Sequence, residues 1–153
     1  MSHPELTQQA LGILRNLDNF QWYFITLLAF VVYIYFNEIS AKNWKGIAAG
    51  LSLYMVHWSY EIINALIQHF SGHALWTVPD STSFLLLIGV GWEISMMFAL
   101  AGLIASKILP ADPEMKILKI NNRIFFAVVN AAFFSIFEIF LVRTPGFHWV
   151  YRW

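Results

Sequence analysis

Four long apolar runs separated by short polar connections dominate the pattern of hydrophobic and polar positions along the chain. Each run has about the 20 residues that a helix needs to cross a bilayer. Prolines, glycines and lysines interrupt the pattern between the runs. Short connections favour antiparallel neighbours. The pattern therefore predicts an all-α integral membrane protein, a four-transmembrane-helix antiparallel bundle in a single membrane domain (1–153), with spans at about 20–39, 46–69, 83–106 and 122–142.

A shorter amphipathic segment precedes the first run. The residues that recur at helical spacing among polar positions are Leu6, Ala10, Leu11, Leu14 and Leu17. A helix with one apolar side is typical of a segment that lies along a membrane interface. The segment has one basic side chain and no small-residue cleavage site, so we do not expect a signal peptide. We predict a short N-terminal interfacial helix over about residues 4–18, with a frayed tail as the alternative.

Composition agrees with a membrane setting. Hydrophobic residues make up 59% of the chain and charged residues 12%, against about 25% charged residues in soluble domains. The apolar composition makes the lipid bilayer the expected partner. Nine basic and nine acidic residues cancel, so we expect no nucleic acid as a partner. The absence of cysteine excludes disulfides, thiolate metal sites and cysteine nucleophiles. Motifs for serine hydrolases, zinc proteases and dinucleotide binding are also absent from the sequence.

Basic residues are distributed unevenly among the connections. The first and third connections, with the start of the fourth run, hold more of them than the tails and the second connection. The positive-inside rule then predicts a multi-pass protein with both termini on the outer, non-cytoplasmic side. The residues that decide this are Lys42, Lys45, Lys107, Lys116, Lys119 and Arg123 on the inner side, and Arg15, Arg143 and Arg152 on the outer side.

The second run carries a regular polar stripe. Tyr54, His57, Glu61, Asn64 and Gln68 are spaced 3, 4, 3 and 4 residues apart, which places them on one face of a helix. Lipid offers these groups no hydrogen-bond partner. The stripe must therefore face protein or water.

The third and fourth runs each add a carboxylate. At a rise of about 1.5 Å per residue, Glu61, Glu93 and Glu138 all fall in the outer half of the membrane. Asn130 lies on the same helix face as Glu138. The sequence therefore predicts an outward-opening polar pocket built by His57, Glu61, Glu93 and Glu138. Other residues near the same end of their predicted helices are Gln21, Tyr23, Thr26, Gly89 and Gly91.

Ionisable residues inside a membrane span are costly, and several of them at one depth favour a functional site. An ionised acid at the bilayer centre costs at least about 2.5 kcal/mol, so several at one depth need an explanation. A single buried amide in a membrane helix is often only a helix-to-helix hydrogen bond. That structural reading is preferred for Asn64, Gln68 and Asn130. The histidine and the three carboxylates are the candidate catalytic residues.

The first functional hypothesis is a membrane enzyme that performs acid/base chemistry. One carboxylic acid would donate a proton to a double bond or epoxide of a small apolar lipid or terpenoid, and a second group would remove a proton elsewhere. Aromatic rings would stabilise the intermediate cation. An isomerase, lyase or cyclase, or epoxide hydrolase is expected, with no cofactor. The expected substrate contacts are Tyr54, Trp58, Asn64, Trp92, Asn130 and Phe134.

The pairing of His57 with Glu61, together with Glu93 in the third run, is similar to the arrangement in the sterol isomerase and emopamil-binding family. The resemblance implies that these three residues form an acid/base set that shifts a sterol double bond. It covers these residues within the second and third runs. Glu138 in the fourth run departs from the family pattern, and a motif analogy of this kind does not fix a function.

A second hypothesis is metal binding by His57, Glu61, Glu93 and Glu138. One histidine with three carboxylates suits iron or manganese by ligand hardness. Carboxylate-bridged di-metal sites in helical bundles need about six ligands, commonly with two histidines. The sequence places one histidine deep in a run, which makes this hypothesis the weaker one.

A third hypothesis is an accessory subunit of a larger membrane complex, such as an oxidoreductase, or a homo-oligomer. The polar stripe would then face a partner helix or a pigment. The aromatic tail TPGFHWVYRW resembles a docking surface, because Trp, Tyr and Arg dominate interface hot spots. The same residues are also typical of anchors at the level of the lipid headgroups.

Overall fold

The computed structural model describes residues 4–80 and 84–151, and this part of the chain is mostly helical. Arg152 and the first residue of the predicted third span lie outside it. The described α-helices are α1 (Pro4–Ile13), α2 (Tyr23–Ser40), α3 (Trp44–Ser71), α4 (Trp92–Ile108) and α5 (Asn122–Leu141), with a 3₁₀ helix, η1 (Leu17–Asn19). The strand pairs are β1 (Trp76–Thr77) with β6 (His148–Trp149), β2 (Leu85–Leu87) with β3 (Val90–Gly91), and β4 (Lys116–Ile117) with β5 (Ile120–Asn121), all antiparallel.

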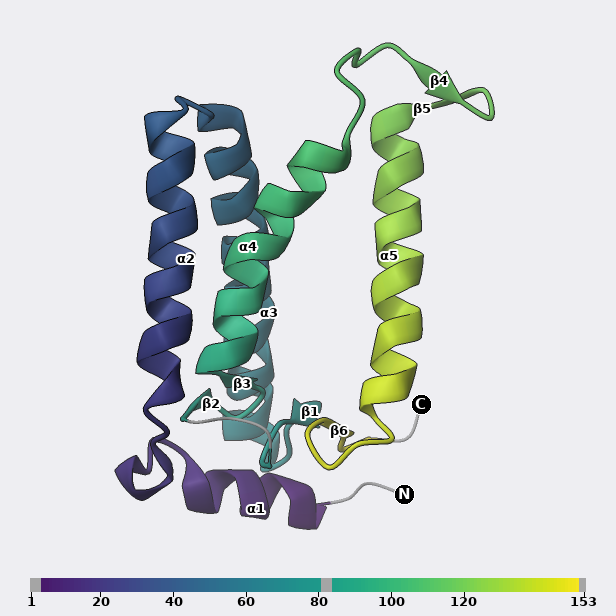
Figure 1. Ribbon diagram of the computed structural model, residues 1–153. Coiled ribbons are helices and arrows are strands. Elements are labelled where there is room, and N and C mark those ends of the chain that lie inside the picture. Colours follow the sequence, from purple (N-terminus) through teal and green to yellow (C-terminus); the bar gives the residue numbers. More distant parts are fainter. Residues whose placement is uncertain (1–3, 81–83, 152–153) are drawn as a thin grey trace.

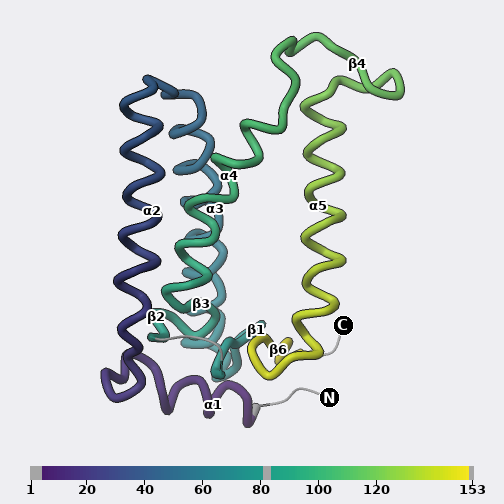
Figure 2. The backbone as a smooth tube through the Cα atoms, viewed as in Figure 1, coloured from purple at the N-terminus to yellow at the C-terminus, as the bar shows by residue number. Residues whose placement is uncertain are grey.

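The four longer helices alternate in direction, and α1 lies across their ends on the same side as β1 and β6 (Figures 1 and 2). Helices α2, α3 and α4 pack against one another, with the most extensive contact between α3 and α4. Helix α5 stands beside this group, and its main contacts are with β4 and β5. We call the end with α1, β1, β2, β3 and β6 the terminal end. The opposite end, where the connections carry most of the lysines, is the lysine end.

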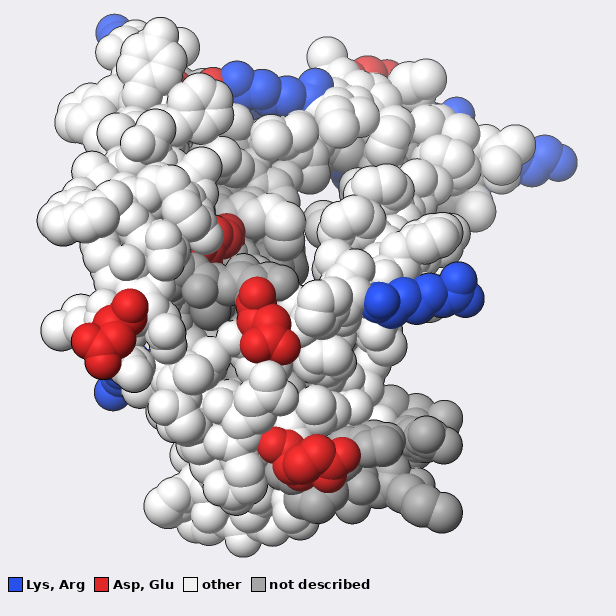
Figure 3. Space-filling view, turned by 60° about the horizontal axis from the view of Figure 1, so that its bottom comes forward, with Lys and Arg blue, Asp and Glu red and all other residues white. Residues whose placement is uncertain are grey.

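The outer surface of the helices is apolar. Helices α2 and α5 are each long and apolar enough to cross a membrane. On α3 the polar residues His57, Glu61 and Asn64 are buried, whereas Met55 and Ile62 are exposed. Figure 3 shows that charged side chains are also sparse on the face seen with the terminal end forward. The polar stripe was predicted to face protein or water, and at these three residues it faces the interior of the protein.

Glycine allows α3 and α4 to approach closely. A Cβ atom on Gly102 would collide with the backbone carbonyl of Ala49 and lie 2.9 Å from Cβ of Leu53. Small residues at such crossings let helix backbones meet, and van der Waals packing then holds them together. Helix α2 joins through Tyr35, whose hydroxyl donates a 2.6 Å hydrogen bond to the carbonyl of Ala99 on α4. These contacts form the frame on which the site is built.

The lysine end is closed by a polar clamp around Glu38, a residue of α2 that is 7% exposed. Lys107 at the end of α4 forms an ion pair with it. The Asn43 amide donates a 2.7 Å hydrogen bond to the same carboxylate, and its oxygen accepts from the Gly46 N–H at 3.1 Å, capping α3. The clamp therefore fixes three helix ends with respect to one another.

Helix α1 is shorter than the predicted 4–18. It ends at Ile13, because Arg15 adopts a left-handed φ of 55° and its N–H donates to the carbonyl of Leu85 at 3.0 Å. Its apolar face packs on protein at the terminal end. This core comprises Ala10, Ala74, Val78, Leu85, Ile88 and Val150, with Leu6, Leu11, Ile13 and Leu14 packed against it.

The predicted helical span 83–106 is wrong in its first part. The chain forms the β2–β3 hairpin with a turn at Ile88 and Gly89, and α4 begins only at Trp92. Leu85 and Val90 are buried against the terminal-end structure. A short apolar run is compatible with a buried strand as well as a helix. Gly89 and Gly91 consequently lie outside the helix that carries Glu93.

Candidate functional site

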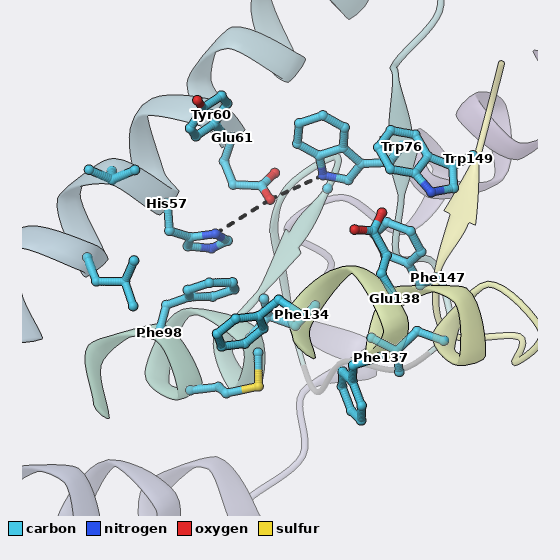
Figure 4. A pocket seen from close by; sticks show the side chains of 16 residues that line it. His57, Tyr60, Glu61, Trp76, Phe98, Phe134, Phe137, Glu138, Phe147 and Trp149 are labelled. Carbon is cyan, nitrogen blue, oxygen red and sulfur yellow. Dashed lines mark hydrogen bonds and ion pairs between the residues drawn. The ribbon is translucent and has the colours of Figure 1, made fainter. Parts of the chain in front are cut away.

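A cavity of about 430 Å³ opens between α3, α4 and α5 at the terminal end. Most of its wall is aliphatic or aromatic, with a small polar group on one side (Figure 4). Pockets of this size with a few placed polar groups are typical of small-molecule sites. The lining residues are Leu53, Val56, His57, Tyr60 and Glu61 from α3; Ile94, Met97 and Phe98 from α4; Phe134, Phe137, Glu138 and Leu141 from α5; and Trp76, Gly89, Phe147 and Trp149 from the terminal-end loops and strands.

Glu61 is the most buried acid in the cavity, at 4% exposure. Its Oε1 atom accepts a 3.2 Å hydrogen bond from the indole N–H of Trp76. Its Oε2 atom is buried without a hydrogen-bond partner among the described residues. A buried polar atom without a partner is costly, so the carboxyl group is suited to a proton or a ligand at this position.

His57 lies one helical turn from Glu61 and is 8% exposed. Its Nδ1 atom is 4.0 Å from Oε1 of Glu61. The imidazole stacks on Phe98 with ring centroids 3.9 Å apart, and Phe98 stacks in turn on Phe134 at 6.2 Å. The Nε2 atom has no hydrogen-bond partner in the described structure. Rings from two other helices, α4 and α5, therefore hold the imidazole beside the carboxylate while one nitrogen stays available.

Asn64 fixes the loop that brings Trp76 to Glu61. Its side-chain oxygen accepts from the Leu75 N–H at 2.8 Å, and its amide donates to the carbonyl of Trp76 at 3.0 Å. Asn64 is fully buried. These bonds match the structural reading of this residue, because they satisfy loop backbone groups and hold the indole in place.

Gly89 leaves room for this arrangement, and Gly89→Ala is expected to disrupt it. A Cβ atom there would collide with Nε1 of Trp76 and crowd Oε2 of Glu61 and the Asn64 amide. We expect the hydrogen bond between Trp76 and Glu61 to break, with a changed indole N–H signal in ¹⁵N NMR and a lower melting temperature. Gly12→Ala is the matched control, because a Cβ atom there meets nothing within 4 Å. An unchanged indole signal in Gly89→Ala would contradict this geometry.

Glu138 enters the cavity from α5, across from α3 (Figure 4). Its carboxylate is hydrogen-bonded to the indole of Trp149. The structure thus brings together three of the four predicted catalytic residues, His57, Glu61 and Glu138, as lining of one cavity.

Glu93 is placed elsewhere. It lies in the first turn of α4 and accepts a hydrogen bond from the hydroxyl of Tyr23 at the start of α2. The neighbouring Trp92 packs on Phe24 with ring centroids 4.6 Å apart. Both residues therefore join α4 to the start of α2.

Of the other predicted substrate contacts, one lines the cavity and the others make contacts elsewhere in the protein. Phe134 lines the cavity. Tyr54 and Trp58 instead converge on the Ser95 hydroxyl of α4, at 3.3 Å and 3.2 Å. The Asn130 amide donates to the carbonyl of Phe126 one turn earlier in α5 at 2.9 Å, a local helix bond.

A metal site receives little support from the geometry. Within residues 4–80 and 84–151, no group of three or more His, Asp or Glu side chains converges closely enough to hold an ion. Glu93 is separated from the other three because it bonds to Tyr23 at the start of α2. The alternative iron or manganese set His57, Glu61, Glu93 and Glu138 is therefore not assembled in this structure.

Three lining residues that sequence reasoning missed come from loops and strands. Trp76 lies in the second connection, and Phe147 and Trp149 lie in the aromatic tail. Within that tail His148–Trp149 form β6, and Phe147 and Trp149 line the cavity. The sequence feature that could have indicated them is the presence of tryptophans in the second connection and in the tail. Tryptophans at such places are equally typical of membrane anchors.

The fold and site define a helical membrane protein with an aromatic, carboxylate-bearing cavity. The chain belongs to a family described as "Uncharacterized membrane protein family", whose model matches residues 4–153. An uncharacterized protein of Archaeoglobus fulgidus is 47% identical over 150 residues, which cover 97% of this chain and 71% of that relative. No solved structure matches the chain.

Proposed function

We propose that the protein is a membrane-embedded enzyme that performs acid/base chemistry on a small apolar lipid or terpenoid. The observation that carries this proposal is the buried His57–Glu61 pair in an aromatic cavity, with Glu138 in the same cavity from another helix. Aromatic and aliphatic walls favour a hydrocarbon ligand, and the few ionisable groups are those that can move protons.

The same proposal includes the membrane arrangement. Helices α3 and α4 would cross the bilayer with α2 and α5, giving four spans. Helix α4 has 17 residues, at the short end of the range of about 17–25 for a spanning helix. The lysine end would face the cytoplasm by the positive-inside rule. Both termini and the cavity would then lie toward the outer side.

The chemistry that these residues suit best is the shift of a carbon–carbon double bond. One carboxylic acid of the Glu61–Glu138 pair would donate its proton to an alkene carbon, which leaves a carbocation at the neighbouring carbon. The faces of Phe98 and Phe134 would stabilise that charge. The other carboxylate would then remove a proton from an adjacent carbon, which forms the new double bond. His57 would hold or pass the proton beside Glu61, and proton exchange with solvent would return both carboxyl groups to their starting protonation states. The substrate loses one proton for each proton that it gains and no electrons are transferred, so no oxidant or cofactor is consumed.

Solvent isotope incorporation tests this proposal directly. The protein purified in mild detergent is incubated in deuterium oxide with farnesol, geranylgeraniol and squalene, and the recovered lipids are analysed by mass spectrometry and NMR. We expect deuterium at alkene or allylic carbons of at least one isoprenoid, because each protonation step draws on solvent. Heat-denatured protein is the control. No incorporation above that control, with these lipids or with lipid that copurifies, would contradict the proposal.

A further inference from the structure

The end wall of the cavity is a short ribbon of two strands, β1 and β6. Trp76 and Trp149 are direct partners in its register. Their rings contact each other edge to face, with centroids 5.6 Å apart and planes at 72°. Both indoles line the cavity (Figure 4). The ribbon therefore presents two paired N–H donors to the same space.

Each indole contacts a different carboxylate. Trp76 donates to Oε1 of Glu61 on α3 at 3.2 Å, and Trp149 is hydrogen-bonded to Glu138 on α5. A continuous chain of contacts thus runs from one acid through two tryptophans to the other. The two acids belong to helices whose main contacts are with other elements.

This chain has a mechanical consequence for the two acids. The α5 helix is attached mainly at its ends, by β4 and β5 at the lysine end and by the segment leading to β6 at the terminal end. Without the ribbon, the separation of Glu61 and Glu138 would follow the movement of α5. Asn64 anchors the β1 side of the ribbon through Leu75 and the Trp76 carbonyl.

We propose that Trp76 and Trp149 are positioning residues that act as one unit and set the separation and facing of the Glu61 and Glu138 carboxyl groups. This inference rests on the proposed function. A proton transferred to one carbon and removed from a neighbouring carbon requires two groups at a defined separation, and a misplacement of about 1 Å costs about 100-fold in rate. The tryptophans would supply that separation without contacting the reacting carbons.

The first test is independent of turnover. The seven tryptophans are labelled with ¹⁵N, and the indole signals of Trp76 and Trp149 are assigned from the variants Trp76→Phe and Trp149→Phe. We expect Glu61→Gln to move the Trp76 signal and Glu138→Gln to move the Trp149 signal. Each single Trp→Phe change should also move the signal of the remaining partner. Unmoved signals would overturn the positioning role, whatever the activity.

The second test measures rate in the deuterium assay with the same isoprenoids. We expect Trp76→Phe and Trp149→Phe to lower kcat about 10-fold to 100-fold with KM nearly unchanged, because phenylalanine keeps a ring but removes the N–H. Trp76→Phe should cause no further loss in the Glu61→Gln background. Trp22→Phe is the control, since Trp22 is 75% exposed. Unchanged kcat in both variants would overturn the inference, whereas inactivity of the wild-type protein would count against the proposed function alone.

Discussion

Glu61→Gln is expected to lower deuterium incorporation about 100-fold to 10,000-fold, the range that a positioned acid or base supplies. Glutamine keeps the size of the side chain and can still accept a hydrogen bond from Trp76, but it cannot gain or lose the proton. At 4% exposure the Glu61 side chain is largely shielded from bulk water. The measurement is the initial rate of isotope uptake per protein molecule.

Glu114→Gln is the matched control for this change. Glu114 is exposed in the connection at the lysine end, far along the chain from the cavity residues, and the chemical change is identical. Both variants should show melting temperatures near that of the unmodified protein. A Glu61→Gln protein that is folded and fully active would remove Glu61 from the proposed acid/base pair.

Gly102→Ala is expected to destabilise the protein by about 1–3 kcal/mol, the usual cost of overpacking a close contact. The added methyl group would meet the backbone carbonyl of Ala49, which a side-chain rotation cannot move away. Helices α3 and α4 would have to separate, and the cavity walls that they carry would shift with them. The change in free energy of unfolding is measured by denaturant titration in a fixed mild detergent.

Gly12→Ala again serves as the comparison, because the space around Gly12 in α1 is open. Alanine is a better helix former than glycine by up to about 1 kcal/mol, so that variant should be as stable as the original protein or more so. Equal stability of Gly102→Ala and Gly12→Ala would show that α3 and α4 do not approach as closely as described.

The four longer helices were largely predictable because each lies in an apolar run of about 20 residues, a length and composition that favour a helix. Helix α5 (Asn122–Leu141) almost coincides with the predicted span 122–142, and α3 (Trp44–Ser71) encloses 46–69. The hairpin at Leu85–Gly91 was not predictable in the same way. Its residues are as apolar as a helix, and only their burial against α1 and the terminal-end core decides between strand and helix.

The part of the site that lies on a single helix could be predicted from the spacing of its residues. The 3-and-4 spacing places His57, Glu61 and Asn64 on one face, and that face is buried. The predicted depth of each acid in the membrane did not show which acids share a cavity. Depth says nothing about how a helix is rotated about its axis or which helices are its neighbours. Glu93 and Glu138 fall at similar predicted depths, yet one bonds to Tyr23 and the other lines the cavity. The contacts of Trp76 and Trp149 depend on pairing between segments far apart in the chain.

The pairing of β6 with β1 has a consequence for how the protein is made. Strand β1 follows α3 directly, whereas β6 comes only after α4 and α5 have been synthesised. Chains emerge from the ribosome with the N-terminal part first, so in the proposed four-span arrangement α3 would enter the membrane with His57 and Glu61 before the far wall of their cavity exists. During that interval the ionisable pair would face lipid, where such groups are expensive. Assembly of the cavity is therefore a late step of synthesis, because α5 and β6 follow α3 and β1 in the chain. In the proposed arrangement, a nascent chain that stops before α5 would leave His57 and Glu61 without the wall that α5 and β6 supply.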